Sequence, residues 1–134
     1  MSQPILIIED EFLIAFEMQR TLKQQGYPVI GIAVDLESAM AFAQRGEIAL
    51  ALVDLNLRDG LTGPQIGTCL ARDYSATVIF VTGNERELGD GIEGTIGVLG
   101  KPADSTDLLS VVDFGLKRRR GEKCAPPSCL RCFS

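Results

Sequence analysis

Four short apolar runs in the sequence each end in groups that can take part in chemistry. The groups are Glu9 and Asp10 after residues 4–8, Asp54 after 48–53, Thr82 after 77–81 and Lys101 after 96–100. Because the carboxyl ends of parallel strands meet at one edge of an open sheet, these carboxylates, this hydroxyl and this ammonium group are expected to converge. Carboxylates that can hold Mg²⁺ beside an ammonium group favour a metal-assisted site that accepts a phosphoryl group.

The chemistry assigned to each group follows from its charge. Asp54 is the expected nucleophile, whose carboxylate would form an acyl phosphate. A cation must offset the repulsion between this carboxylate and a phosphoryl group, and Mg²⁺ held by Glu9, Asp10 and Asp54 would do so. Lys101 would bind a phosphoryl oxygen as a compact point charge. The Thr82 hydroxyl would bind another oxygen.

Each motif also has a purely structural explanation. Glu9 and Asp10 suit the first turn of a helix, where acids are favoured, and Asp54 suits a turn before Asp59-Gly60. Thr82-Gly83 and Lys101-Pro102 are ordinary loop sequences. Their joint occurrence after four predicted strands favours a site over four unrelated loops.

The hydrophobic pattern predicts alternating strands and helices. Strands are expected near 4–8, 28–34, 48–53, 77–81 and 96–99, and helices at 11–25, 36–45, from Pro64 onward, and 104–119. The strands lack clean alternation of polar and apolar residues, which is typical of a parallel sheet covered on both faces. The fourth unit, 85–94, contains three glycines, so its helix is expected to be short or irregular. The prediction is a five-stranded α/β domain over residues 1–119.

Over residues 4–119, the chain resembles the receiver domains of two-component response regulators. The resemblance rests on Glu9-Asp10, Asp54, Thr82 and Lys101-Pro102, in this order and spacing. It implies a flavodoxin-like doubly wound fold with strand order 2-1-3-4-5. It also implies phosphorylation of Asp54 by a histidine kinase or a histidine phosphotransfer protein.

The resemblance implies finer roles at the site. The backbone carbonyl of Asn56 would complete the Mg²⁺ ligands, and backbone N–H groups of Leu55 and Gly83 would bind phosphoryl oxygens. Asn56 and Asn84 would influence the lifetime of the acyl phosphate, and the Lys101–Pro102 bond would be cis.

The chain departs from the family at the switch. The aromatic residue that many receivers carry in the fifth strand aligns with Val98. The sequence Phe80-Val81-Thr82-Gly83 is similar to a subclass with Phe-Ala-Thr-Gly, with Val in place of Ala. These departures, with the glycines of 85–94, favour switching by ordering of a loose loop.

Charge and cysteine content set residues 120–134 apart. Residues 117–134 carry +5 and residues 1–116 about −10, so the body does not resemble a nucleic-acid-binding domain. We expect 120–134 to be a flexible basic tail. Cys124, Cys129 and Cys132 have part of an iron–sulfur spacing without a fourth ligand downstream, so free thiols are expected.

Several functions remain open from the residues alone. A dehalogenase-type phosphatase needs a second acid two residues after the nucleophile, where this chain has Asn56. A flavodoxin-like cofactor carrier would need a phosphate-binding loop after the first strand, and this chain has none there. A receiver that has lost its chemistry would bind its partners independently of phosphorylation. We expect a cytoplasmic protein, because the start of the chain does not resemble a signal peptide. By resemblance, we expect a single-domain regulator that is not an enzyme, with a protein partner on the 84–119 face and no DNA-binding domain. No apolar run is long enough to span a membrane, and a homodimer through the last helices is left open.

Overall fold

The structure of the protein is a computed structural model that describes residues 3–133; residues 1, 2 and 134 of the predicted domain and tail lie outside the described part. The elements are β1 (Ile5–Ile8), α1 (Phe12–Gln24), β2 (Val29–Ala33), α2 (Leu36–Arg45), β3 (Leu50–Val53), α3 (Gly63–Tyr74), β4 (Thr77–Thr82), the 3₁₀ turn η1 (Glu85–Leu88), β5 (Gly97–Gly100), α4 (Ser105–Arg119) and β6 (Leu130–Cys132). The predicted elements are present, with ends shifted by a few residues at most.

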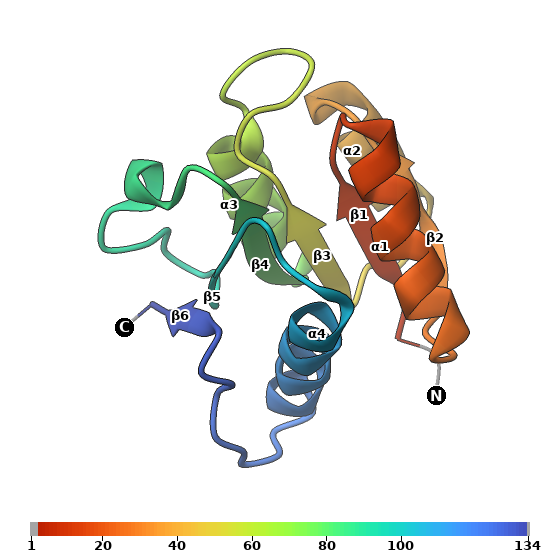
Figure 1. Ribbon diagram of the computed structural model, residues 1–134. Coiled ribbons are helices and arrows are strands. Elements are labelled where there is room, and N and C mark those ends of the chain that lie inside the picture. Colours follow the sequence, from red (N-terminus) through yellow and green to blue (C-terminus); the bar gives the residue numbers. More distant parts are fainter. Residues whose placement is uncertain (1–2, 134) are drawn as a thin grey trace.

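One six-stranded sheet forms the centre of the molecule, in the order β2-β1-β3-β4-β5-β6 (Figure 1). The first five strands are parallel, and β6 is antiparallel to β5. The flavodoxin-like fold and the 2-1-3-4-5 order are therefore confirmed. Because β1, β3 and β4 run in the same direction side by side, the residues that follow them lie at the same end of the sheet, beyond the carboxyl ends of the strands.

Helices cover both faces of the sheet, α1 and α4 on one and α2 and α3 on the other (Figure 1). Side chains of β1 alternate between the two cores: Ile5 and Ile7 face α1 and α4, while Leu6 and Ile8 face α2 and α3. All four are fully buried. Burial on both faces explains why the strands read as continuous apolar runs.

Local sequence signals fix where the helices begin. The Asp35 carboxylate accepts the Ser38 N–H at 2.9 Å, and the Ser38 hydroxyl accepts the Asp35 N–H at 3.2 Å, which forms a capping box at α2. Asp104 caps α4 by accepting the Asp107 N–H at 2.8 Å. These caps satisfy backbone donors that the first helical turn leaves unpaired.

The fourth unit forms no α-helix. Only the short turn η1 forms after β4, and the chain then passes through Gly89, Gly91 and Gly94, all with positive φ. Glycine adopts this backbone conformation without the strain that a side chain would cause. The prediction of an irregular fourth helix is confirmed. Among residues 3–133, the helices are too short or too polar to cross a membrane.

The expectation of a free tail after residue 119 needs correction. Leu130, Arg131 and Cys132 pair with Leu99, Val98 and Gly97 of β5, so the sheet has a sixth strand. The strand is only three residues long, and its weak alternation of polar and apolar residues did not predict it. What stabilises the strand is its position beside the open edge of β5, which tertiary structure creates.

Candidate functional site

Three carboxylates meet where β1 and β3 end. One oxygen each of Glu9, Asp10 and Asp54 lies within 4.8 Å of the others. The backbone fixes two of them: the Asp54 N–H donates to the Ile8 carbonyl, and the Glu9 N–H to the Ala33 carbonyl, each at 2.9 Å. Glu9 and Asp54 are buried, whereas Asp10 is half-buried. Such a cluster of acids has the charge and the oxygen ligands to hold a divalent cation.

The Lys101 side chain extends across the carboxyl ends of the strands and contacts two of these acids. Its Nζ lies 2.5 Å from Glu9 Oε1 and 3.0 Å from Asp54 Oδ2. The lysine follows β5, two strands away from β3, and the Lys101–Pro102 peptide bond is cis. One ammonium group thus bridges the ends of β1 and β3, and it offsets part of their negative charge.

Burial and mutual charge shift the pKa values at this cluster. Desolvation by burial raises the pKa of Glu9, and the nearby Asp54 charge adds to this, while the contact with Lys101 opposes it only in part. Burial alone would lower the pKa of Lys101, but its hydrogen bonds to Glu9 and Asp54 outweigh burial and raise it. Lys101 therefore stays protonated at neutral pH.

A polar pocket of about 360 Å³ opens beside Asp54. Its lining includes Asp10, Asn56, Thr82, Gly83, Asn84 and Lys101. Thr82 is almost wholly buried, and its Oγ1 accepts the Asn84 N–H at 3.1 Å. Opposite charges, a hydroxyl and exposed backbone thus face one another across a space that can admit a small anion.

The remaining residues predicted for the site lie at different depths. Asn56 is exposed at the pocket rim. The Leu55 N–H donates to the Asp54 carboxylate itself at 2.7 Å. Val98 is fully buried in the core beneath α2 and α3, apart from the pocket lining.

Sequence analysis missed one residue that positions the site, Gly63 at the start of α3. A Cβ there would lie 2.1 Å from the Asp54 carbonyl oxygen and 2.5 Å from Leu55 Cα. The Gly63 N–H also donates to the Leu55 carbonyl at 3.0 Å. Glycine thus lets the helix approach the backbone at Asp54. A glycine before Pro64 was the only sequence signal, and it fits any helix start.

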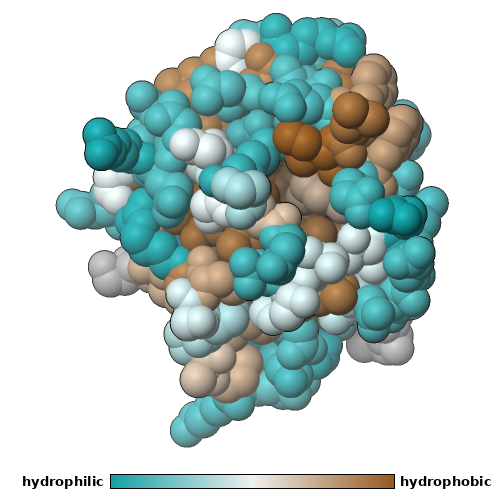
Figure 2. Space-filling view, viewed as in Figure 1, coloured by the Kyte–Doolittle hydropathy of each residue, from teal (hydrophilic) through white to brown (hydrophobic). Residues whose placement is uncertain are grey.

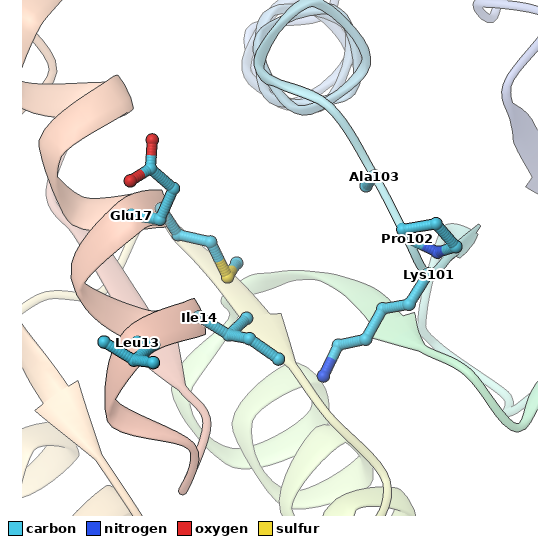
Figure 3. Close-up of a pocket in the computed structure, with 7 residues that line it drawn as sticks. Leu13, Ile14, Glu17, Lys101, Pro102 and Ala103 are labelled. Atoms are coloured by element: carbon cyan, nitrogen blue, oxygen red, sulfur yellow. The ribbon is translucent and has the colours of Figure 1, made fainter.

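An exposed apolar patch on α1, formed by Phe12, Leu13 and Phe16, borders the site. These side chains are 58%, 87% and 54% exposed. Figure 2 shows hydrophobic residues gathered over α1. Beside the patch lies a hollow of about 600 Å³, with Leu13, Ile14 and Glu17 of α1 on one side and the 101–103 loop on the other (Figure 3).

The cysteines lie apart from this site. Cys129 Sγ is 3.9 Å from the Asp107 carbonyl, and Cys69 Sγ is 3.5 Å from Met40 Sδ. Within residues 3–133, only Glu9, Asp10 and Asp54 form a group of three potential metal ligands at close range. All four cysteines are free thiols.

The chain is similar to known response regulators over most of its length. The model of the response regulator receiver domain family matches residues 5–113. The phyllosphere-induced regulator PhyR of Methylorubrum extorquens is 31% identical over 118 residues, which cover 87% of this chain and 44% of that protein. The transcriptional regulatory protein PdtaR of Mycobacterium tuberculosis is 26% identical over 120 residues, which cover 87% of this chain and 58% of that protein.

Solved structures agree with the fold. The response regulator PhyR from Brucella abortus has a TM-score of 0.78 at 25% identity, over 90% of this chain and 50% of that one. A CheY-like receiver domain protein from Methanospirillum hungatei has a TM-score of 0.76 at 24% identity, over 92% of this chain and 100% of that one. The chain spans about half the length of the curated relatives it matches.

Proposed function

The chain belongs to the response-regulator receiver family, and from that premise we propose that it is a phosphorylatable switch of a two-component phosphorelay. Receiver domains are signalling phosphoacceptors, and the acidic cluster fits the phosphorylation site of the family. The observation that carries the proposal is the contact of Lys101 Nζ with both Glu9 and Asp54. Lysine, Thr82 and three acids around one pocket form the charge pattern that phosphoryl transfer to a carboxylate requires.

In the proposed reaction, Asp54 is the nucleophile. A carboxylate oxygen forms a bond to phosphorus as the phosphorus–nitrogen bond of a phosphohistidine breaks. The bonding electrons return to the imidazole, which takes up a proton. Lys101 and the Thr82 hydroxyl, with the N–H groups of Leu55 and Gly83, stabilise the charge on the phosphoryl oxygens. The chain performs this chemistry only on itself.

Mg²⁺ is the proposed cofactor. Glu9, Asp10 and Asp54 would hold it, together with the carbonyl of Asn56, and it would neutralise charge between Asp54 and the phosphoryl group. The spacing of the three carboxylates fits such an ion. The protein residues would orient Asp54 and donate hydrogen bonds to the phosphoryl oxygens.

Intact mass spectrometry tests this function. The full chain is incubated with acetyl phosphate and Mg²⁺ beside the Asp54→Asn variant. We expect one phosphoryl adduct on the wild type, and none on the variant or when EDTA removes the metal. Beryllofluoride, a stable analogue of the acyl phosphate, is titrated into the same sample to cover a short-lived adduct. If neither the donor nor the analogue binds, Asp54 does not accept phosphoryl groups. The alternative function, a module that binds partners independently of phosphorylation, would then be favoured.

The phosphodonor is proposed to be a sensor histidine kinase or a histidine phosphotransfer protein that covers the α1 patch. A protein that brings phosphohistidine to Asp54 must lie over the rim of the pocket, and Ile14 lines both the pocket and the adjoining hollow. The exposed apolar side chains of the patch suit such a contact. A downstream protein would use the 84–119 face.

Leu13→Asp tests this docking surface. Because Leu13 is 87% exposed, the change should leave the fold and acetyl phosphate labelling unaltered. Transfer from a phosphorylated phosphotransfer protein should slow by about tenfold, because a charge would be buried on docking. Leu61→Asp, at a side chain that is 50% exposed and outside the patch, is the matched control. Equal transfer rates for the two variants would exclude α1 as the docking surface.

A further inference from the structure

Residues 130–133 close the edge of β5. Besides the pairing of β6 with β5, the Phe133 N–H donates to the Ile96 carbonyl at 2.8 Å. The fit depends on Gly97, where a Cβ would lie 2.5 Å from the Arg131 carbonyl oxygen. The segment thus occupies hydrogen-bonding groups that an edge strand otherwise presents to another chain.

Two apolar anchors hold this segment, one on each face of the sheet. Leu130 is 7% exposed and joins the core beneath α1 and α4. Phe133 packs against the other core, with its ring centroid 6.5 Å from that of Phe80. The Phe133 ring also lies against Gly91, where a Cβ would be 2.4 Å from its Cγ. The loose glycine segment after η1 is therefore covered by Phe133.

Arg131 provides the polar contacts of the segment. Its Nη1 donates to the Gly89 carbonyl at 3.0 Å and its Nη2 to the Glu85 carbonyl at 3.4 Å. Its Nε lies 3.9 Å from Glu85 Oε1, with both side chains nearly half exposed. The two contacts with Glu85, at 3.4 and 3.9 Å, are long and join exposed groups, so they are weak and small movements of Glu85 can break them.

Glu85 also belongs to the loop that borders the phosphoacceptor pocket. Asn84, its neighbour, lines the pocket and donates its N–H to Thr82. The Glu85 carboxylate lies against Gly100, where a Cβ would be 2.6 Å from Oε2, and Gly100 precedes Lys101. One short loop therefore touches both the pocket and Arg131.

We propose that residues 130–133 are a cis-bound strand that covers the partner surface at β5 and is released when Asp54 is phosphorylated. The inference rests on the proposed function. A phosphoryl group in the pocket attracts the N–H groups of the 83–84 loop and repels the Glu85 carboxylate. The loop then moves relative to Arg131, its weak contacts break, and the β5 edge becomes available to a downstream protein that adds an extended segment.

Amide hydrogen exchange on the full chain tests this release. The chain is compared in Mg²⁺ with and without beryllofluoride. With the analogue bound, the amides of β6 and Phe133 should exchange at least about threefold faster, while those of β1 and β3 stay protected. Unchanged exchange at β6 with beryllofluoride bound would overturn the release and leave the proposed function intact. Failure of beryllofluoride to bind would overturn both.

A pair of arginine variants tests the route through Glu85. Arg131→Ala should speed exchange at β6 without any analogue, and Arg118→Ala, at an exposed arginine with no ion pair to any residue within 3–133, should not. Coupling between two sites is reciprocal, so Arg131→Ala should also tighten beryllofluoride binding by about two- to fivefold. Equal beryllofluoride affinity in the two variants would overturn the coupling.

Discussion

The Lys101 ammonium group lies where a positive charge is needed to offset two neighbouring carboxylates. Its Nζ contacts Glu9 and Asp54, two buried carboxylates whose charges repel each other. Burial raises the pKa of Glu9, and the contact with Lys101 opposes this rise only in part. Lys101 and the proposed Mg²⁺ would therefore offset the negative charge of the same acids.

If both act on these acids, the stability of a Lys101→Ala variant should depend on the metal. Without Mg²⁺, the free energy of unfolding should fall by about 1–3 kcal/mol, less than for a fully buried pair because the lysine side chain is 18% exposed. With saturating Mg²⁺, the deficit should shrink, because the ion replaces the lost charge. Urea denaturation with and without Mg²⁺ measures both values.

Lys117→Ala is the control for this experiment. Lys117 forms an exposed pair with Asp113 at 3.0 Å on α4, away from the acids. Its removal should change stability by less than about 0.5 kcal/mol, with no dependence on Mg²⁺. A Lys101→Ala deficit that is the same in EDTA and in Mg²⁺ would contradict the shared electrostatic role.

The elements place these groups through close backbone contacts as well as through strand order. At Gly63, the first turn of α3 touches the backbone of Asp54 and Leu55. Phe80 of β4 lies equally close to Gly67, where a Cβ would be 2.5 Å from its Cζ. Helix α3 therefore sits nearer the sheet than side chains would permit, and it fixes the loop that carries Asp54.

Gly63→Ala should disturb this loop. The new methyl group would collide with backbone atoms that cannot rotate away, so the free energy of unfolding should fall by about 1–3 kcal/mol. Labelling of Asp54 by acetyl phosphate should also slow. Chemical denaturation and mass spectrometry measure the two effects.

Gly46→Ala is the matched control for the glycine experiment. Gly46 has an extended backbone, and a Cβ there meets nothing within 4 Å. Its replacement should leave stability within about 0.5 kcal/mol of the wild type and labelling unchanged. Wild-type behaviour of Gly63→Ala would show that α3 does not position Asp54.

At the scale of the whole molecule, basic residues at the end of α4 and after it contact the rest of the domain. Arg120 Nη1 donates to Gln3 Oε1 at 2.6 Å, Arg119 to the Ser75 carbonyl at 2.6 Å, and Arg131 contacts the 85–89 turn. A body of about −10 also attracts a segment of +5, which adds to the strand pairing and apolar contacts that hold residues 130–133 at the sheet. The result is a molecule with one lateral edge of its sheet covered by its own chain.

This covering separates two surfaces. The α1 patch borders the hollow beside the pocket and is exposed, whereas the lateral edge of β5 is occupied by β6. A phosphodonor would therefore meet the carboxyl ends of the strands, and a downstream partner would meet the lateral edge of the sheet at β5. Only the second would depend on a change within the chain.

The sequence by itself determined the alternation of strands and helices, the parallel sheet and the acids at its edge. Burial on both faces leaves continuous apolar runs, and the residue after each run must lie at the strand end, so Glu9, Asp54, Thr82 and Lys101 could be placed without coordinates. The irregular fourth unit was also readable, because its glycines weaken any helix.

Tertiary structure alone decided how closely these parts approach and what covers the open edge. The contact of Gly63 with Asp54 depends on the spacing between a helix and a loop, which no local pattern encodes. The strand at 130–132 forms because β5 offers unpaired backbone groups and two cores accept Leu130 and Phe133. The strand joins residues distant in sequence, whose contacts exist only after the chain has folded.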